Sequence, residues 1–340
     1  MAKAVADTNS GSNQGGFTTD GSNVTGFSSM HDSGTGGSPS LGNFALFPYA
    51  ECAGDEVDGC DFPKVSRAIP FLNDSVVASP GYFGLQLSSG ILVDMTTTSH
   101  TSLFRFKFPT TGPSGNTSSP LILLDLTDLS DSRQDNGTVS VDADSGRIVG
   151  NARFLPSFGS GTYILYFCAD FSGAPIRDNG IFANSRASAD VKNLTISRSI
   201  NGYPLPGGAW VRFEPGNEDI LARVGVSFIS SDQACSSAEA EIPSFDFDSV
   251  KSAAESAWRE RISRITVSTV GVAQSTLTNF YSGIYRTMVS PQISGVLLPF
   301  SRALRNRCLK NCQTSSSECL KLCEKVTPHP NKVPVHIASR

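Results

Sequence analysis

The feature that most constrains this chain is a series of short apolar runs, separated by Gly, Pro, Asn and Asp, that continues to about residue 245. Several runs alternate apolar and charged residues, as LFRFKF does at 103–108, which is typical of a strand with one polar face. The run at 121–124 is apolar throughout and is expected to be buried on both faces. Many short strands without intervening long helices predict a mainly β fold, and we expect residues 1–245 to form an antiparallel β-sandwich.

Residues 246–292 change to helical spacing. Apolar side chains three or four positions apart predict a first helix, with Asp248 or Ser249 as the residue that caps its start. A second apolar stripe predicts another helix over 277–290. Two amphipathic helices at the end of a sandwich cannot bury both stripes by themselves, so we expect them to belong to a larger helical domain.

Residues 293–340 differ from the rest in charge, with eight Lys or Arg and two Asp or Glu. Four cysteines in this segment form two pairs spaced i, i+4: Cys308, Cys312, Cys319 and Cys323. Two disulfides across a helical hairpin are one interpretation, since each pair would share a helix face. A zinc site of four thiolates, or one that uses His329 or His336, is another. The third, which we prefer, is a basic, Cys-rich tail that is disordered or is an artefact of the gene model.

The bulk composition argues against some classes of partner. The formal net charge of −4 gives no reason to expect a nucleic acid or an anionic membrane surface. No apolar run reaches the length that is needed to span a membrane.

Two features are typical of the secretory pathway. Five Asn-X-Ser/Thr sequons are present, at Asn23, Asn73, Asn116, Asn136 and Asn193. Cys52 and Cys60 are placed to close a short disulfide loop in an oxidising compartment. The N-terminus lacks the basic and apolar regions of a signal peptide. We therefore expect the intact protein to be secreted, with its true start upstream of Met1; if Met1 is the start, we expect a cytosolic protein.

Acidic residues offer few catalytic candidates. The stretch LLDLTDLSDSRQD suggests a calcium site or an acid/base pair, but it lacks the Gly and Glu positions of an EF-hand. Its carboxylates, and others in turn-like sequences, are favoured as turn formers: Asp125, Asp128, Asp131, Asp135, Asp142, Asp144 and Glu214. No phosphate-binding loop or nucleophile elbow is recognisable. The sequence alone therefore identifies no catalytic residue and no metal ligand.

The stretch GFSSMHDSGTGGSP, residues 26–39, places His31 and Asp32 in a run of Gly and Ser. Glycine allows a ligand to approach the backbone closely, and the imidazole and hydroxyl groups supply hydrogen-bond donors and acceptors. A sugar or phosphate site is one interpretation, and an ordinary surface turn is the other.

Several stretches of residues 1–292 resemble the α-mannosidases of glycoside hydrolase family 92 (GH92), in their fungal-type form. The most specific is GFSSMHDSGTGG, which is similar to the signature GFSHxHxSGTG, with Ser29 at the first histidine position and His31 at the second. MAKAVADTNS and NQGGF resemble segments near the start of the family's first domain, and YSGIYRTMVSPQ resembles the first helix of its second. The resemblance ends at about Gln292.

This resemblance implies an N-terminal β-sandwich joined to a C-terminal (α/α)6 barrel, with the sugar pocket between them. Members are exo-α-mannosidases that act on N-glycans with inversion and need Ca²⁺, with catalytic carboxylates and calcium ligands in the barrel. We therefore expect 1–245 to be the sandwich, 246–292 to be the linker helix and first barrel helix, and 293–340 to be unmatched. The chain is expected to bind carbohydrate and to serve glycoprotein deglycosylation only with the missing barrel, with no catalytic residue, metal ligand or bound Ca²⁺ of its own.

The resemblance also suggests which residues contact a mannose-containing N-glycan. Imidazole, hydroxyl and backbone N–H groups of the signature, with nearby turns, are the substrate-binding candidates: His31, Ser33, Gly34, Thr35, Gly36, Gly16, Phe17 and Asp7. An aromatic ring such as that of Phe17 or Tyr49 is expected to cover an apolar sugar face.

Three alternatives stay open. A stand-alone lectin-like protein would use the same loop without catalysis. A structural or redox protein would depend on the cysteine pairs. Some relatives carry a peptide-N-glycan amidase label, although no Cys, His and Asp in this chain are placed to support that chemistry.

Overall fold

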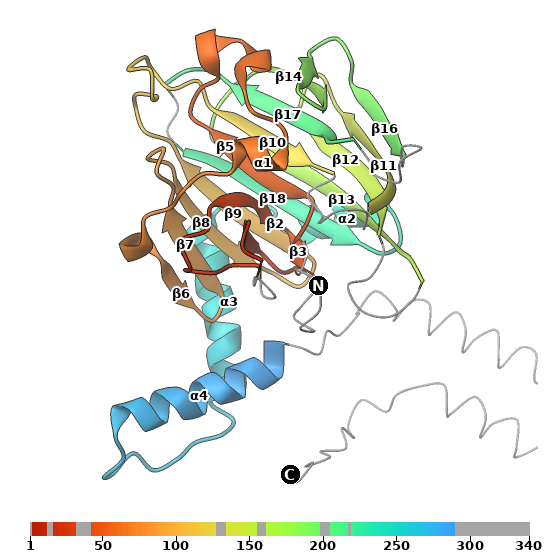
Figure 1. Ribbon diagram of the computed structural model, residues 1–340. Coiled ribbons are helices and arrows are strands. Elements are labelled where there is room, and N and C mark those ends of the chain that lie inside the picture. The colour runs from red at the N-terminus through yellow and green to blue at the C-terminus, as the bar shows by residue number, and fades with distance from the viewer. Residues whose placement is uncertain are drawn as a thin grey trace, which may run out of the picture. The chain divides into compact units, whose positions relative to one another are not determined.

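Figure 1 shows the computed structural model of the chain, which describes residues 2–11, 16–31, 42–126, 134–154, 161–197, 205–216 and 219–289. At 134, 135 and 289 it describes the backbone alone. These residues belong to one compact unit that spans 1–292. They form two antiparallel sheets followed by helices, which confirms the mainly β prediction. The cysteine pairs, His329 and His336 of the tail lie outside the described residues.

The first sheet has seven strands in the order β1-β2-β5-β10-β17-β14-β15. Their bounds are β1 (Val5–Thr8), β2 (Val24–Ser28), β5 (Ala45–Tyr49), β10 (Leu121–Asp125), β14 (Ile176–Ala183), β15 (Arg186–Ser188) and β17 (Gly207–Phe213). A separate two-stranded ladder joins β3 (Met30–His31) to β4 (Gly42–Asn43).

The second sheet has nine strands in the order β16-β11-β12-β13-β18-β9-β8-β7-β6. Their bounds are β6 (Val77–Ser79), β7 (Tyr82–Gln86), β8 (Leu92–Thr97), β9 (Thr101–Lys107), β11 (Gln134–Val141), β12 (Ile148–Phe154), β13 (Tyr163–Ser172), β16 (Asn193–Ser197) and β18 (Asp219–Ser227). The helices are the short α1 (Lys64–Arg67), then α2 (Ser231–Glu241), α3 (Phe247–Ile262) and α4 (Gln274–Val289).

The main core contains residues from both sheets. Aromatic rings meet across it, with centroids 6.0 Å apart for Phe27 and Phe106 and 4.3 Å apart for Phe44 and Phe167. Because successive side chains of a strand point to opposite faces, each sheet also has an outer face that must be covered or polar.

Strand β10 shows why the apolar run at 121–124 is buried on both faces. Ile122 and Leu124 belong to the main core. Leu121 and Leu123 belong to a second cluster with Trp210 and with Cys52 and Cys60, which form a disulfide as expected. The central position of β10, between β5 and β17, and this second cluster explain a strand without polar alternation.

Strand β9 alternates as predicted, but α3 covers part of its charged face. The Arg105 guanidinium donates a hydrogen bond to Asp94 on the neighbouring strand, with 2.7 Å between Nη2 and Oδ2. Its Cζ atom lies 4.3 Å from the ring centroid of Phe247 at the start of α3. The face that carries the charges is therefore a docking face for a helix and is not simply solvated.

Helix α2 has no counterpart in the sequence prediction, which assigned the whole of 1–245 to a β unit. Ser230 caps the helix by accepting a hydrogen bond from the Gln233 amide at 3.1 Å. Ala234 and Ala238 pack on Gly225 of β18, where a Cβ would come within 3.0 Å of the Ala238 Cβ. The helix is rich in small and polar residues and carries no strong apolar stripe, so periodicity does not reveal it.

Two further links hold α2 to the nine-stranded sheet. Cys235 is disulfide-bonded to Cys168 of β13. At the other end of the helix, Glu241 accepts hydrogen bonds from the Thr98 hydroxyl and from the amide of His100 at 2.9 Å. Burial opposes ionisation of Glu241, but these bonds and the adjacent His100 ring outweigh it and lower the pKa of the carboxyl.

Helices α3 and α4 both begin earlier in the chain than the sequence predicts. Asp246 caps α3 by accepting from the Ser249 amide at 3.0 Å, so the cap lies earlier than Asp248 or Ser249. The reason is that Phe247 must enter the first turn to reach the cluster that contains Leu103. Helix α4 begins at Gln274, ahead of its apolar stripe. None of the helices in the described ranges is both long and apolar enough to cross a membrane.

The two disulfides make a matched comparison, because a crosslink restricts the unfolded chain more strongly when it closes a longer loop. The sequence separation is 67 for Cys168–Cys235 and 8 for Cys52–Cys60. We expect alanine replacement of the first pair to lower the free energy of unfolding by about 4 kcal/mol, and replacement of the second by about 2.5 kcal/mol. Urea unfolding of both double variants measures the difference. Equal losses, or a larger loss for the short loop, would contradict this prediction.

Candidate functional site

A buried pair of titratable side chains lies where β1, β2 and β3 meet. Asp7 of β1 and His31 of β3 are 3.3 Å apart, measured from Oδ1 to Nε2, and both side chains are almost fully buried. The other carboxylate oxygen of Asp7 accepts a hydrogen bond from the Ser28 hydroxyl on β2. We call Asp7, Ser28 and His31 the β1–β3 polar cluster.

The strand register brings these residues together. Strand β1 is the edge strand of the seven-stranded sheet and pairs with β2 so that Asp7 lies opposite Gly26, with a bulge directly after Asp7. In the β3–β4 ladder His31 lies opposite Gly42. Bulges at sheet edges commonly redirect side chains toward functional sites.

The cluster has hydrogen-bonding capacity that the described residues do not use. Asp7 Oδ1 and His31 Nε2 are buried without a hydrogen-bond partner there, because their mutual approach lacks hydrogen-bond geometry. The hydroxyl of Ser29, between β2 and β3, and the side-chain oxygen of Asn43 on β4 are also buried without a hydrogen-bond partner there. Leaving a buried polar atom unpaired costs about 1–3 kcal/mol, so the facing atoms of Asp7 and His31 indicate a site that a ligand or water completes.

Two glycines form walls of the cluster. Gly16 has a φ of +91°, and a Cβ there would come within 2.5 Å of Val5 Cγ1 and 2.7 Å of His31 Nε2. A Cβ on Gly42 would overlap the Ser28 hydroxyl and the Asp7 carboxylate. Larger residues at either position would displace the polar groups.

The structure therefore brings together three of the predicted substrate-binding residues: Asp7, Gly16 and His31. Phe17 is half-buried and its ring packs on Phe71 and Phe83, with centroids 5.1 and 5.0 Å apart. These are core contacts, and the expected role of Phe17 in covering a sugar stays a prediction. The remaining candidates lie outside the described residues: Ser33, Gly34, Thr35 and Gly36.

Tyr49, the other expected aromatic ring, donates its hydroxyl hydrogen to the carbonyl oxygen of Asp61. Its ring lies 5.0 Å from that of Phe47, measured between centroids. These are contacts within the layer that covers the outer face of the seven-stranded sheet.

The sequence prediction missed Gly42 and Asn43 as parts of this region and gave Ser28 no specific partner. Asp7 and His31 are distant in sequence from one another, and the register that joins their strands is a tertiary property. The one local signal for the missed residues is that four residues separate the Gly42-Asn43 dipeptide from the end of the Gly-rich run at Gly37.

The acidic candidates of the sequence have other partners. Asp125 is fully buried and forms an ion pair with Arg67 of α1. Asp142 forms the expected hairpin turn, where hydrogen bonds from the Ser145 hydroxyl and from the Ser145 amide, each at 2.7 Å, lower the pKa of its carboxyl. Asp144 and Glu214 are exposed, whereas Asp128, Asp131 and the side chain of Asp135 lie outside the described residues. No three His, Cys, Asp or Glu side chains of the described residues converge as a metal site.

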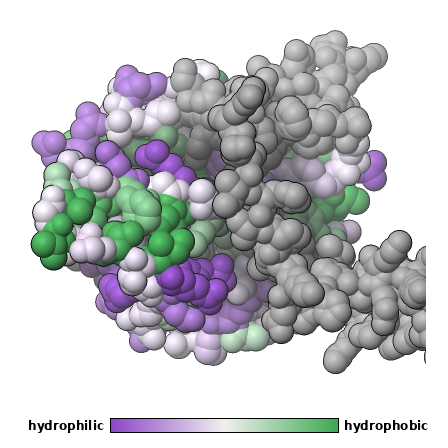
Figure 2. All heavy atoms as spheres, turned by 90° about the horizontal axis from the view of Figure 1, so that it is seen from below, coloured by the Kyte–Doolittle hydropathy of each residue, from purple (hydrophilic) through white to green (hydrophobic). Residues whose placement is uncertain are grey.

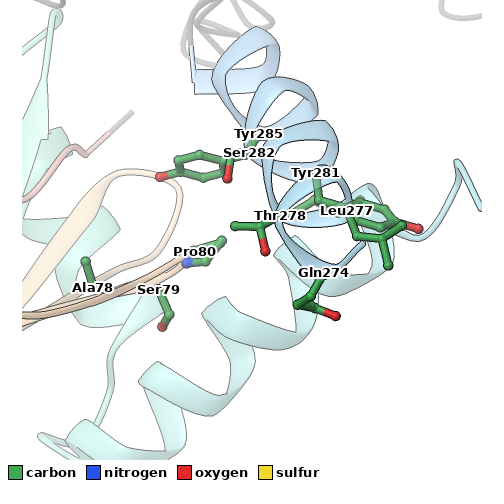
Figure 3. A pocket seen from close by; sticks show the side chains of 10 residues that line it. Ala78, Ser79, Pro80, Gln274, Leu277, Thr278, Tyr281, Ser282 and Tyr285 are labelled. Atoms are coloured by element: carbon green, nitrogen blue, oxygen red, sulfur yellow. The ribbon is translucent and has the colours of Figure 1, made fainter. Parts of the chain in front are cut away.

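A second concave feature lies between α4 and the β6–β7 hairpin (Figure 3). This groove of about 560 Å³ is lined by Ser79 and Pro80 of the hairpin and by α4 residues that include Leu277, Tyr281 and Tyr285. Figure 2, seen from below, shows hydrophobic residues gathered at this part of the molecule. None of the side chains that line this groove is an acid, histidine or lysine, whereas the adjoining groove on α3, which shares Ser79, Pro80 and Tyr281 with it, includes Glu255.

Gly16 and Gly21 test the packing of the polar cluster, because both have positive φ and only Gly16 is crowded. Gly21→Ala should cost about 1 kcal/mol of unfolding free energy through backbone strain alone. Gly16→Ala should cost about 1–3 kcal/mol more, because the methyl group meets Val5 and His31. Urea unfolding of the two variants gives the difference, and equal losses would show that Gly16 is not held against His31.

Comparison with known proteins assigns the two parts of the described chain. Residues 1–227 match the family model of the glycosyl hydrolase family 92 N-terminal domain, and residues 233–296 match that of the family 92 catalytic domain. The chain is 48% identical over 297 residues to a protein of Arthroderma benhamiae named "Uncharacterized secreted glycosidase", covering 86% of this chain and 38% of that protein.

Solved structures show the same fold. The family GH92 inverting mannosidase from Bacteroides thetaiotaomicron VPI-5482 aligns with a TM-score of 0.67 at 20% identity, over 85% of this chain and 35% of that one. A family GH92 alpha-mannosidase from Bacteroides thetaiotaomicron gives a TM-score of 0.65 at 21% identity, over 84% of this chain and 36% of that one. The chain thus spans little more than a third of these relatives, and it belongs to glycosyl hydrolase family 92.

Proposed function

We propose that this chain supplies the N-terminal sandwich of an exo-α-mannosidase that acts on N-glycans, and that the β1–β3 polar cluster forms one wall of its sugar site. The observation that carries the proposal is the buried Asp7–His31 pair, whose facing atoms have no hydrogen-bond partner among the described residues. The pair lies within the part of the chain that matches the N-terminal domain of the family.

The chemistry of the cluster suits a sugar. Each hydroxyl of a mannose residue both donates and accepts hydrogen bonds, and its partners must be directional. Asp7 offers a carboxylate oxygen as an acceptor, and His31 Nε2 donates or accepts according to its tautomer. Both side chains are held by packed strands, so they would not need to be ordered on binding.

The cluster alone does not supply the hydrolytic step. Inverting hydrolysis needs one carboxylic acid and one carboxylate roughly 6.5–9.5 Å apart. Asp7 is the one carboxylate of the cluster, and the buried Asp125 and Asp170 are held by Arg67 and Arg223. We propose that the catalytic pair comes from the part of the catalytic domain that lies beyond the match at 233–296, and that this chain by itself is inactive.

The same argument applies to the Ca²⁺ that the family resemblance implies. Calcium takes six to eight oxygen ligands, commonly with several carboxylates. No three acidic or histidine side chains of the described residues converge as a metal site, and Asp125, Asp142 and Asp170 already have partners. They do not fit this ion, and no step is assigned to it here.

Secretion fits the remaining observations. The Arthroderma benhamiae relative is named as secreted. All four cysteines of the described ranges are disulfide-bonded, which is typical of oxidising compartments. We propose that the full-length protein meets its glycoprotein substrates in or beyond the secretory pathway.

Calorimetry with the full chain and α-linked mannobiose tests the proposal. We expect weak binding, and Asp7→Asn should weaken it by about tenfold, since a hydrogen bond to a charged group contributes about 1.5 kcal/mol. His31→Gln should have a similar effect, whereas Asp142→Asn, in an exposed turn, should have none. Thermal unfolding checks that the variants remain folded.

Two results would contradict the proposal. One is mannobiose binding that neither cluster variant alters. The other is release of mannose by the full chain that a chelator abolishes, because this would place the complete catalytic and calcium machinery in these 340 residues.

A further inference from the structure

Two of the five sequons lie side by side on one surface of the nine-stranded sheet. In antiparallel pairing, residues directly opposite one another share a face. Strands β11 and β16 pair so that Thr138 lies opposite Thr195 and Asn193 lies opposite Ser140. Since Asn136 is two residues before Thr138, all four sequon side chains of the two strands are on the same face.

That face is open to solvent. The side chains of both asparagines and both threonines are exposed: Asn136, Thr138, Asn193 and Thr195. The residues between them point the other way and are buried in the main core, as Val139 and Ile196 are. Asn151 donates a hydrogen bond to the Thr138 hydroxyl oxygen at 2.9 Å, which leaves the hydroxyl hydrogen of Thr138 available.

In the other three sequons, the hydroxyl group of the third residue is buried or half-buried and is hydrogen-bonded to the backbone of the fold. Thr25 is fully buried, and its hydroxyl donates to the carbonyl oxygen of Asp7. Ser118 is buried and bonds the carbonyl oxygen of Pro109. The Ser75 hydroxyl accepts from the Gln86 amide at 2.8 Å and is half-buried.

The position in the sheet also suits a bulky modification. Strand β16 is one edge of the nine-stranded sheet, and β6 is the other. Helix α3, which belongs to the part matched by the catalytic-domain model, packs on β7, β8 and β9 near the β6 edge (Figure 1). A large group on β11 and β16 therefore leaves the surface under α3 free, and α2 packs mainly on β13 and β18, on the far side of β12.

We propose that Asn136 and Asn193 both carry N-linked oligosaccharides, which cover the outer face of the β11–β16 edge. In each transfer the Nδ2 atom of asparagine forms a bond to C1 of the first sugar of a polyprenyl-pyrophosphate-linked oligosaccharide. The C1–O bond to the pyrophosphate breaks, the pyrophosphate leaves with that electron pair, and one amide proton is lost to the enzyme's base.

This arrangement has a physical consequence for the edge. An edge strand presents unpaired backbone N–H and C=O groups that can recruit a strand from another molecule. The edge strand β16 has the sequence NLTIS and carries no Lys or Arg to repel a second edge; Arg153, a cation of this outer face, lies opposite Asn136 on β12, away from the edge. Two adjacent glycans would prevent such pairing sterically.

The test uses the full chain, produced behind a secretion signal in a eukaryotic host, with site occupancy measured by peptide mass spectrometry after enzymatic removal of glycans in ¹⁸O water. We expect label at both Asn136 and Asn193. Thr138→Ala and Thr195→Ala should each remove one site, whereas Thr138→Ser and Thr195→Ser should retain it. Ser140→Ala and Ser197→Ala change the same face without touching a sequon and should leave both sites occupied.

Glycoprotein retained inside the cells is analysed in the same way, so a variant that folds poorly still reports its occupancy. Unmodified Asn136 or Asn193 in the secreted chain would overturn the proposal. A second readout addresses coverage: the Asn136→Gln/Asn193→Gln variant should form at least about twofold more aggregate on heating than the Ser140→Ala/Ser197→Ala variant. Equal aggregation would show that the glycans do not protect this edge.

Discussion

The packing of two antiparallel sheets against each other is the constraint on which the rest of the structure depends. Each strand sends alternate side chains into the shared core, and the opposite side chains must then be polar or covered. The seven-stranded sheet covers Leu121, Leu123 and Trp210 with the segment closed by the Cys52–Cys60 disulfide. The nine-stranded sheet covers part of its outer face with α2 and α3.

Helices α2 and α3, which cover part of the nine-stranded sheet, also connect the parts of the chain that match the family's two domain models. Helix α2 is fixed to β13 and β18 through a disulfide and through contacts of Ala234 and Ala238 with Gly225. Arg223 extends the link, since it pairs with Asp170 on the sheet and donates to the carbonyl oxygen of Ile242 just after α2. The start of the match to the catalytic-domain model is thus part of the sandwich surface. Both α3 and α4 carry apolar side chains that the described chain leaves half-buried, such as Trp258 of α3 and Leu277 of α4.

The polar cluster departs from the general rule that buried polar atoms are paired. Proteins commonly break local rules at functional sites, where a ligand completes what the fold leaves open. Around Asp7 and His31 the crowded glycines at 16 and 42 hold the polar groups close together, and β1 is held by its pairing with β2.

Much of this fold was predictable from sequence, because period-two alternation and short apolar runs are local signals. The burial of both faces of 121–124 and the Cys52–Cys60 pair were also predictable. Helix α2 was not, since its stability comes from close packing on Gly225 and from a bond to Cys168, which lies 67 residues away. The Asp246 cap depends on where Phe247 docks, and the Asp7–His31 pair depends on register. Such long-range relations leave no pattern in a local window of sequence.

We propose that the sugar binds where β1, β2 and β3 meet. Hydrogen–deuterium exchange of the full chain, with and without α-linked mannobiose, tests this site directly. We expect slower exchange in peptides that cover Val5–Thr8 and Val24–Ser28, with no change in α2 (Ser231–Glu241). Slower exchange confined to α4, or none in either strand at a sugar concentration that saturates binding, would contradict it.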